Sequence, residues 1–152
     1  MLTRREAFRA LAASAAAVLA GSGRSLHAAP RVTMQVRKDP GCGCCDKWAD
    51  HFRQAGFTVE VTEDPDRVAY RNRLGIPAEW QTCHTGVVEG FVVDGHVPAD
   101  LVRKMLADKP AIRGLAVPGM PMGSPGMEGP VTQRYDVLAF MKDGKSSVYA
   151  RR

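Results

Sequence analysis

The stretch VTMQVRKDPGCGCCDKWADHFRQAG, residues 32–56, contains the pattern that decides the fold. Its opening residues, 32–36, are rich in β-branched side chains and predict a short strand. The Asp-Pro-Gly triplet at 39–41 ends that strand. Over 44–55 apolar residues recur at helical spacing, and Gly56 closes the predicted helix. A strand that leads through a cysteine-rich turn into a helix is typical of an α/β domain.

The same alternation of strands and helices continues along the chain. Alternating or β-branched runs predict further strands at 57–62, 85–88, 91–93, 135–141 and 145–149. A second helix has Asp64 as its cap, Pro65 as its first residue and Gly75 at its end, and Pro98 opens a third. Strands joined through a helix pair in parallel, whereas hairpin strands pair antiparallel. We therefore predict an α/β fold, a thioredoxin-like mixed sheet with flanking helices and a C-terminal β-hairpin.

A segment rich in proline and glycine, residues 111–130, precedes that hairpin. Such a composition predicts no regular element, and a loop of this length in a compact domain is usually functional or disordered. We expect residues 29–110 to form the thioredoxin-like core. Residues 111–152, the methionine-rich loop and the hairpin, are expected to complete the same domain.

The first 28 residues have the order of an export signal. A basic start is followed by a small-residue apolar stretch at 10–20 and then by small residues before Pro30. The pair Arg4 and Arg5 resembles a twin-arginine signal. We expect cleavage after Ala28 and a periplasmic mature protein, in which disulfides are permissible.

Net charge and hydropathy exclude two classes of partner. The whole chain carries a formal charge of +5, but four arginines and one glutamate in residues 1–28 account for +3 of it, which leaves +2 for the rest. A nucleic-acid-binding function therefore loses its electrostatic support. No apolar run approaches the roughly 18 residues that span a bilayer, so we expect no stable membrane insertion.

All four cysteines lie in two places, Cys42-Gly43-Cys44-Cys45 and Cys83, which His84 follows. The first group precedes a predicted helix, whose unpaired N–H groups and partial positive charge favour thiolates. Thiolate is the form that binds metals and attacks disulfides. In the predicted sheet the second group runs beside the end of the first strand. We therefore expect Cys83 and His84 to face the cysteine-rich loop.

Three interpretations of these cysteines compete. Cys42 and Cys45 form a C-x-x-C dithiol pair, although a third thiol at Cys44 would divert the disulfide. Structural disulfides are a second interpretation, which requires Cys83 to pair with the loop. The third is a metal site, because soft thiolates select Cu(I), zinc or iron–sulfur clusters. Zinc fits less well, since its cysteine sites usually have C-x₂₋₄-C spacing in each half.

Three methionines on the proline- and glycine-rich segment favour copper among these metals. Met120, Met122 and Met127 lie within eight residues of one another. A thioether is a poor ligand for zinc and a good ligand for Cu(I). The alternative is that these side chains fill gaps over the core.

Histidines and arginines of the chain are further candidates for polar roles. His84 follows a cysteine, so we expect it to bind the metal or to support a ligand. His96 lies in a turn before a helix and is either a ligand or a plain turn residue, and His51 is interpreted as a surface residue. The predicted second helix carries arginines that we interpret as a solvated face: Arg67, Arg71 and Arg73.

These residues resemble the CopG-like family of exported bacterial copper resistance proteins. The motifs that carry the resemblance are Cys42-Gly43-Cys44-Cys45 with Trp48, Gly75-Ile76-Pro77, Cys83-His84-Thr85, Gly95-His96-Val97-Pro98-Ala99, Gly114 to Pro121, and Gly123 to Glu128. The likeness runs from about residue 32 to the end of the chain. It implies a thioredoxin-like fold and copper held in a multinuclear, thiolate-bridged cluster. The ligands it implies are Cys42, Cys44, Cys45 and Cys83, joined by His84, His96, Met120 and Met127.

We therefore expect an exported protein that holds Cu(I) in copper resistance and homeostasis, with other periplasmic copper-handling proteins as partners. The alternative is a periplasmic thiol-disulfide or copper oxidoreductase that uses the Cys42 and Cys45 pair. Against disulfide exchange, Pro77 lies five residues before Thr82 rather than directly before the strand. A third class is an interaction domain stapled by disulfides.

Overall fold

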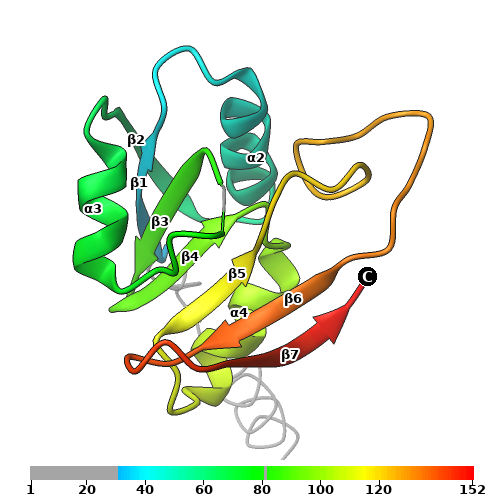
Figure 1. Cartoon of the computed structure of the whole chain (residues 1–152). Helices are drawn as coiled ribbons and strands as arrows, with labels where there is room; N and C mark the ends of the chain where they lie inside the picture. The colour runs from blue at the N-terminus through cyan, green and yellow to red at the C-terminus, as the bar shows by residue number, and fades with distance from the viewer. Residues whose placement is uncertain (1–30, 81) are drawn as a thin grey trace, which may run out of the picture.

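The computed structural model describes residues 31–80 and 82–152, so the predicted signal peptide and its cleavage point lie outside the described residues. Strands and helices alternate along the described chain (Figure 1). In chain order they are β1 (Thr33–Lys38), α2 (Gly43–Gln54), β2 (Thr58–Glu63), α3 (Arg67–Leu74), β3 (His84–Val88), β4 (Phe91–Gly95), α4 (Ala99–Asp108), β5 (Gly114–Val117), β6 (Asp136–Phe140) and β7 (Ser146–Arg151).

The strands form one seven-stranded mixed sheet in the order β2-β1-β3-β4-β5-β6-β7. The pairs joined through a helix, β1 with β2 and β4 with β5, are parallel. The other four pairs are antiparallel. The mixed α/β sheet is therefore confirmed, together with both predicted hairpins. The thioredoxin-like assignment of this sheet stays a prediction.

Apolar side chains bury both faces of the sheet. On one face α2 and α4 pack their apolar stripes, among them Trp48, Phe52 and Met105, against the strands. The other face carries a smaller cluster that includes Trp80 and Phe140, next to the end of α3. Because helices cover both faces, the central strands are buried along most of their length.

The expectation that residues 111–130 hold no regular element is wrong at β5. All four residues of this strand are buried, and it pairs with β4 on one side and β6 on the other. A Cβ at Gly114 would lie 1.9 Å from the Val92 carbonyl oxygen, so only glycine permits this close pairing. The sequence of a strand buried on both faces is a continuous apolar run without alternation. Here the surrounding prolines and glycines masked that run.

The second predicted helix starts later than its sequence signal indicates. Asp64 is not the cap of α3, because Asp66 occupies that position and the helix begins at Arg67. A carboxylate oxygen of Asp64 instead accepts the backbone N–H of Asp66 at 2.9 Å, and the side chain pairs with Arg37 at 2.8 Å. The Asp-Pro sequence thus forms a local turn before the helix rather than its first turn.

Candidate metal centre

Strand pairing brings the two cysteine segments together. Strands β1 and β3 run antiparallel with Lys38 opposite His84, so the loop after β1 lies beside the residue that precedes β3. The backbone N–H of Asp39 donates to the Cys83 carbonyl oxygen at 3.0 Å. Cys83 therefore faces the cysteine-rich loop, as the sequence predicts.

The four cysteine sulfur atoms form one compact group. The Sγ atoms of Cys44 and Cys83 are 3.7 Å apart, and those of Cys45 and Cys83 are 3.3 Å apart. The Sγ atom of Cys42 lies 3.4 Å from that of Cys44. All four lie within 4.8 Å of one another. A group of this size allows one sulfur to bridge two soft metal ions.

Two of the four cysteines are joined in this structure. A disulfide links Cys42 to Cys45, while Cys44 and Cys83 carry thiols. The pairing is that of the C-x-x-C interpretation and differs from the structural-disulfide interpretation, which required Cys83. Cys45 is buried, at 1% exposure, and the other three cysteines are half-buried. A metal bound by all four sulfurs therefore requires the reduced form.

The environment of Cys83 disfavours its charged form. Burial is the main cause, followed by the neighbouring Cys44, and together they raise the pKa of the Cys83 thiol to about 12. The Arg67 guanidinium opposes this shift. Cys83 is therefore a neutral thiol at physiological pH in this form, and metal binding there must release a proton.

His84 lies at the inner side of the sulfur group and is fully buried. Its Nε2 is 3.0 Å from the Gly95 carbonyl oxygen. Because a carbonyl oxygen only accepts, Nε2 carries the proton, and Nδ1 keeps its lone pair. That Nδ1 lies 3.7 Å from the Cys83 Sγ atom. Burial, with a smaller effect of His96, lowers the pKa of His84 well below its ordinary value, so the ring is neutral.

His96 is the second buried imidazole, and its ring centre lies 4.9 Å from that of His84. Its Nδ1 lies 2.8 Å from the Pro125 carbonyl oxygen. Because that oxygen only accepts, Nδ1 carries the proton and donates it. The Nε2 atom is then an unprotonated acceptor, and it has no hydrogen-bond partner among the described residues. Burial also lowers the pKa of His96. The structure therefore places both predicted histidines beside Cys83.

The methionine-rich loop, residues 118–132, lies between β5 and β6 and curls beside α2 (Figure 1). It approaches closely at Gly126, where a Cβ would lie 2.7 Å from the Cys44 carbonyl oxygen. Met127 is half-buried, whereas Met120 is 53% exposed. The loop thus covers the start of α2, and metal ligation by these two methionines stays a prediction.

The interpretation of the α3 arginines as a solvated face is wrong for Arg67 and Arg71, which are 5% and 6% exposed. Arg67 pairs with Asp39 at 2.7 Å and also donates to the Thr82 carbonyl oxygen. These partners flank the two cysteine segments, so Arg67 ties them together. Arg71 pairs with the buried Asp94 at 3.2 Å. Burying each cation beside an acceptor offsets part of the desolvation cost.

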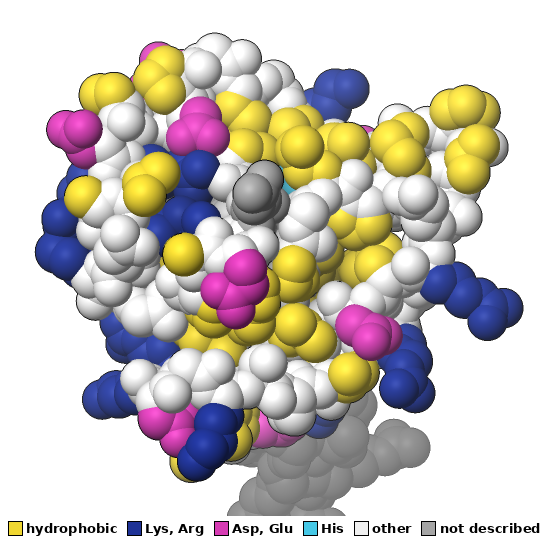
Figure 2. Space-filling view, in the orientation of Figure 1, with side chains coloured by type: hydrophobic (Ala, Val, Ile, Leu, Met, Phe, Trp, Pro, Cys, Tyr) yellow, Lys and Arg dark blue, Asp and Glu magenta, His cyan; other side chains and the backbone are white. Residues whose placement is uncertain are grey.

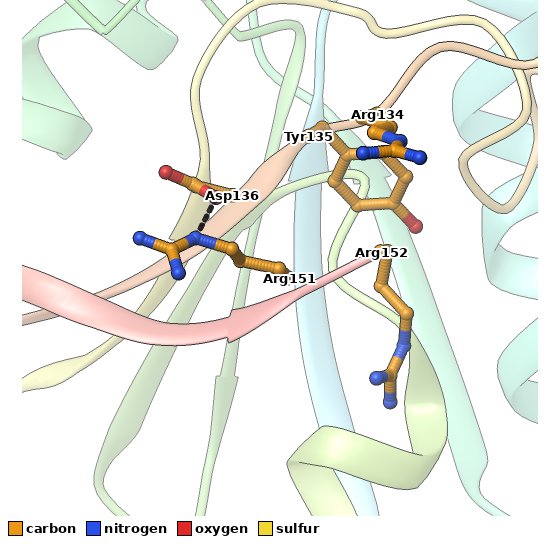
Figure 3. A pocket seen from close by; sticks show the side chains of 5 residues that line it. All are labelled: Arg134, Tyr135, Asp136, Arg151 and Arg152. Carbon is orange, nitrogen blue, oxygen red and sulfur yellow. Dashed lines mark ion pairs between the residues drawn. The ribbon is translucent and has the colours of Figure 1, made fainter.

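Another concave region lies apart from the cysteines, at the C-terminal end of the chain. A cavity of about 510 Å³ is lined by Arg134, Tyr135, Asp136, Arg151 and Arg152 (Figure 3). Its Arg151 and Asp136 side chains form an ion pair at 3.4 Å. It contains no thiol and no imidazole, so it does not extend the metal centre.

On a mixed α/β sheet, four cysteine sulfurs and two buried imidazoles gather at one point and form a site of the cysteine-cluster class that could hold a metal ion. Two solved structures resemble the chain, titled "Copper resistance protein copG- Form 2" and "Copper resistance protein copG- Form 1". Each is 41% identical, has a TM-score of 0.76, and matches over 80% of this chain and 98% of its own. The chain belongs to the CopG family of copper resistance proteins.

Part of the chain also matches a family model of unknown function. Residues 80–127 match the model of a family described as a protein of unknown function, DUF411, and this range contains Cys83, both buried histidines and part of the methionine-rich loop. A search of curated protein sequences gave no match. Within the described part of the chain, no helix is long and apolar enough to cross a membrane. The relatives and the cysteine group together support a copper-related role.

Proposed function

We propose that this protein is an exported copper-binding protein that holds Cu(I) in copper resistance and homeostasis. The ligands are the sulfurs of Cys42, Cys44, Cys45 and Cys83, arranged as a multinuclear, thiolate-bridged cluster. The observation that carries the proposal is the convergence of these four sulfurs within 4.8 Å. Thiolates are soft ligands that select Cu(I), and one bridging thiolate keeps each of two ions at low coordination.

The location of the site supports a protective role. The cysteines lie under the methionine-rich loop and beside the buried Trp48 and His84. Shielding of this kind limits the access of oxidants and of other metal sites to bound copper. Thioethers of Met120 and Met127 then pass copper to and from the thiolates by ligand exchange, with other periplasmic copper-handling proteins as donors and acceptors.

Export places this chemistry in the periplasm. Residues 1–28 provide the signal, of the twin-arginine type, and the mature chain begins after them. The Cys42–Cys45 disulfide suits an oxidising compartment. Copper loading of all four cysteines then begins with reduction of that disulfide to two thiols by a dithiol reductant.

A second candidate function is an oxidoreductase that acts on disulfides or on copper. The observation that favours it is the disulfide at the start of α2, with the Cys83 sulfur 3.3 Å from that of Cys45. A neighbouring sulfur at that distance is placed for exchange with the disulfide once its thiol is deprotonated, because the thiolate is the attacking form. Turnover in a disulfide-reductase or cuprous-oxidation assay would distinguish this enzyme from a passive copper binder.

The proposed binding function is tested by titrating the reduced chain with Cu(I) in the absence of oxygen and counting bound ions by native mass spectrometry. We expect several coppers per chain, and their loss in the double variant Cys44→Ser, Cys83→Ser. The matched control is Met141→Leu, an exposed residue of the C-terminal hairpin. Unchanged copper uptake in the double-cysteine variant would refute the proposal.

A further inference from the structure

The metal centre contains a second group of ligands that does not depend on the disulfide cysteines. One ligand atom each from Cys83, His84 and His96 lie within 4.8 Å of one another. Both histidines are fully buried, and Cys83 is half-buried. None of the three residues takes part in the Cys42–Cys45 disulfide. This group is therefore intact in the oxidised form of the protein.

Backbone carbonyls fix the proton positions on both imidazoles. Gly95 holds the proton of His84 on Nε2, and Pro125 holds the proton of His96 on Nδ1. Each ring therefore keeps one unprotonated nitrogen. Metal-binding histidines in proteins have the same arrangement, in which the other ring nitrogen donates to a carbonyl or carboxylate and so orients the ligand.

Hydrogen bonds among the described residues satisfy one of these lone pairs only weakly and leave the other without a partner. The Cys83 thiol can donate weakly to Nδ1 of His84 at 3.7 Å. No donor among the described residues reaches Nε2 of His96, although that atom is buried. An unsatisfied buried acceptor destabilises the folded protein. A cation that binds both nitrogens and the sulfur would remove this destabilisation.

We propose that Cys83 Sγ, His84 Nδ1 and His96 Nε2 form a mononuclear copper site that stays available while Cys42 and Cys45 are joined. A trigonal set of one thiolate and two imidazoles is characteristic of copper. Binding forms one metal–sulfur bond and releases the proton of the Cys83 thiol to solvent. The inference rests on the proposed copper-binding function and specifies which copper site the disulfide form of the protein retains.

The disulfide then sets the copper capacity of the centre. With the Cys42–Cys45 bond intact, the protein holds one ion at the cysteine–histidine site. Reduction of that bond consumes two electrons and two protons from a dithiol and yields two further thiols. These thiols, together with Cys44 and Cys83, extend the site to the multinuclear form. Copper capacity is therefore coupled to the redox state of one cysteine pair.

The test uses the double variant Cys42→Ser, Cys45→Ser, which removes the disulfide pair and leaves the three proposed ligands. The variant is titrated anaerobically with Co(II), a probe that reports thiolate ligation by charge-transfer absorption and does not oxidise thiols. We expect one Co(II) per chain with a thiolate charge-transfer band. Adding His96→Gln should weaken binding by about tenfold or more. The control His51→Gln should leave affinity and spectrum unchanged.

Two outcomes would overturn the site: absence of the charge-transfer band, or a band that persists unchanged in the His96→Gln variant. If the double-serine variant does not fold, the wild-type protein with its disulfide intact decides the question in the same titration. Cu(I) counting keeps the two proposals apart. A reduced wild type that binds one ion only would contradict the multinuclear cluster and leave this site standing. Several ions in the reduced wild type, with none in the double-serine variant, would contradict the cysteine–histidine site and leave the multinuclear cluster standing.

Discussion

Gly126 shows at the scale of one residue how the methionine-rich loop is held on the metal centre. Its backbone has a φ of +86°, and a Cβ there would lie 2.7 Å from the Cys44 carbonyl oxygen and 2.9 Å from the Trp48 nitrogen. Only glycine combines this conformation with this approach. The loop backbone at Gly126 therefore lies directly against the first two turns of α2.

The variant Gly126→Ala should lift the loop from α2. We expect a loss of about 1–3 kcal/mol in the free energy of unfolding, because strain and overpacking act together. Transfer of Cu(I) to a competing chelator should also become faster. Urea unfolding and stopped-flow transfer measure the two effects.

The matched control for this prediction is Gly119→Ala in the same loop. Gly119 has a similar φ of +73°, but a Cβ there meets nothing within 4 Å. This variant should show the conformational cost without faster copper transfer. Equal transfer rates in the two variants would contradict a covering role for the loop.

Arg67 is the residue that joins the two cysteine segments. Replacing it with methionine removes the pair to Asp39 and the donor to the Thr82 carbonyl oxygen. We expect Cu(I) affinity to fall by about tenfold, the lower end of the effect of losing a residue that orients metal ligands. Competition titration measures the affinity, and Arg73→Met, on the exposed side of α3, is the control. An unchanged affinity in the Arg67 variant would show that the cysteines hold their arrangement without it.

At the scale of elements, a histidine links helix α2 to helix α4. The Nε2 atom of His51 accepts the backbone N–H of Ala99 at 3.1 Å, so an imidazole satisfies one of the unpaired donors at the start of α4. Burial is the main cause that lowers the pKa of His51, against smaller opposing effects of Glu128 and Asp100. His51 is therefore a half-buried cap rather than a simple surface residue.

This contact predicts how stability depends on pH. The folded protein lowers the pKa of His51, so the unfolded chain binds the proton more readily. The stabilisation is present above the unfolded pKa of about 6.5 and is lost as pH falls through the folded value. Urea unfolding of the metal-free protein between pH 7.5 and pH 5, approximate limits chosen around that pKa, measures the dependence.

His51→Gln provides the control for this dependence, because an amide oxygen can accept the Ala99 N–H without titrating. The variant should unfold with a shallower loss of stability on acidification. An identical pH dependence in wild type and variant would assign the effect to other groups.

Elements differed in how well the sequence predicted them. Strands and helices with clear alternation or helical spacing, such as β1 and α2, lie within a residue or two of their predicted ends. Strand β5 was missed because a strand buried on both faces has no alternation. The start of α3 was misplaced because the Asp64 side chain forms a local turn instead of a cap.

At the scale of the whole molecule, the sequence predicts which residue types form the candidate site. The predicted sheet placed Cys83 and His84 beside the end of the first strand and so indicated that they face the cysteine-rich loop. The pair between Arg67 and Asp39 was not predictable, because it depends on how the start of α3 packs beside the loop after β1. The proton positions of the two imidazoles depend on carbonyls of Gly95 and Pro125 that only the folded chain brings near.

Two parts of the chain meet at the metal centre. The cysteines come from the segments between β1 and β3, with two of them on α2, and His84 begins β3, whereas the methionine-rich loop between β5 and β6 contacts His96 and α2. Hydrophobic side chains gather on the face over β5 and β6 and on the projecting loop (Figure 2). Met120 and Val131 of that loop are exposed hydrophobic residues. The centre thus depends on the whole sheet and not on the cysteine motif alone.

The central claim, that copper is held on bridging cysteine sulfurs, is tested most directly by copper X-ray absorption spectroscopy of the reduced, Cu(I)-loaded protein. We predict nearest neighbours dominated by sulfur, together with copper–copper scattering from a multinuclear cluster. Both signals should be lost in the variant Cys44→Ser, Cys83→Ser. A spectrum with only nitrogen and oxygen neighbours and no copper–copper scattering would contradict the account.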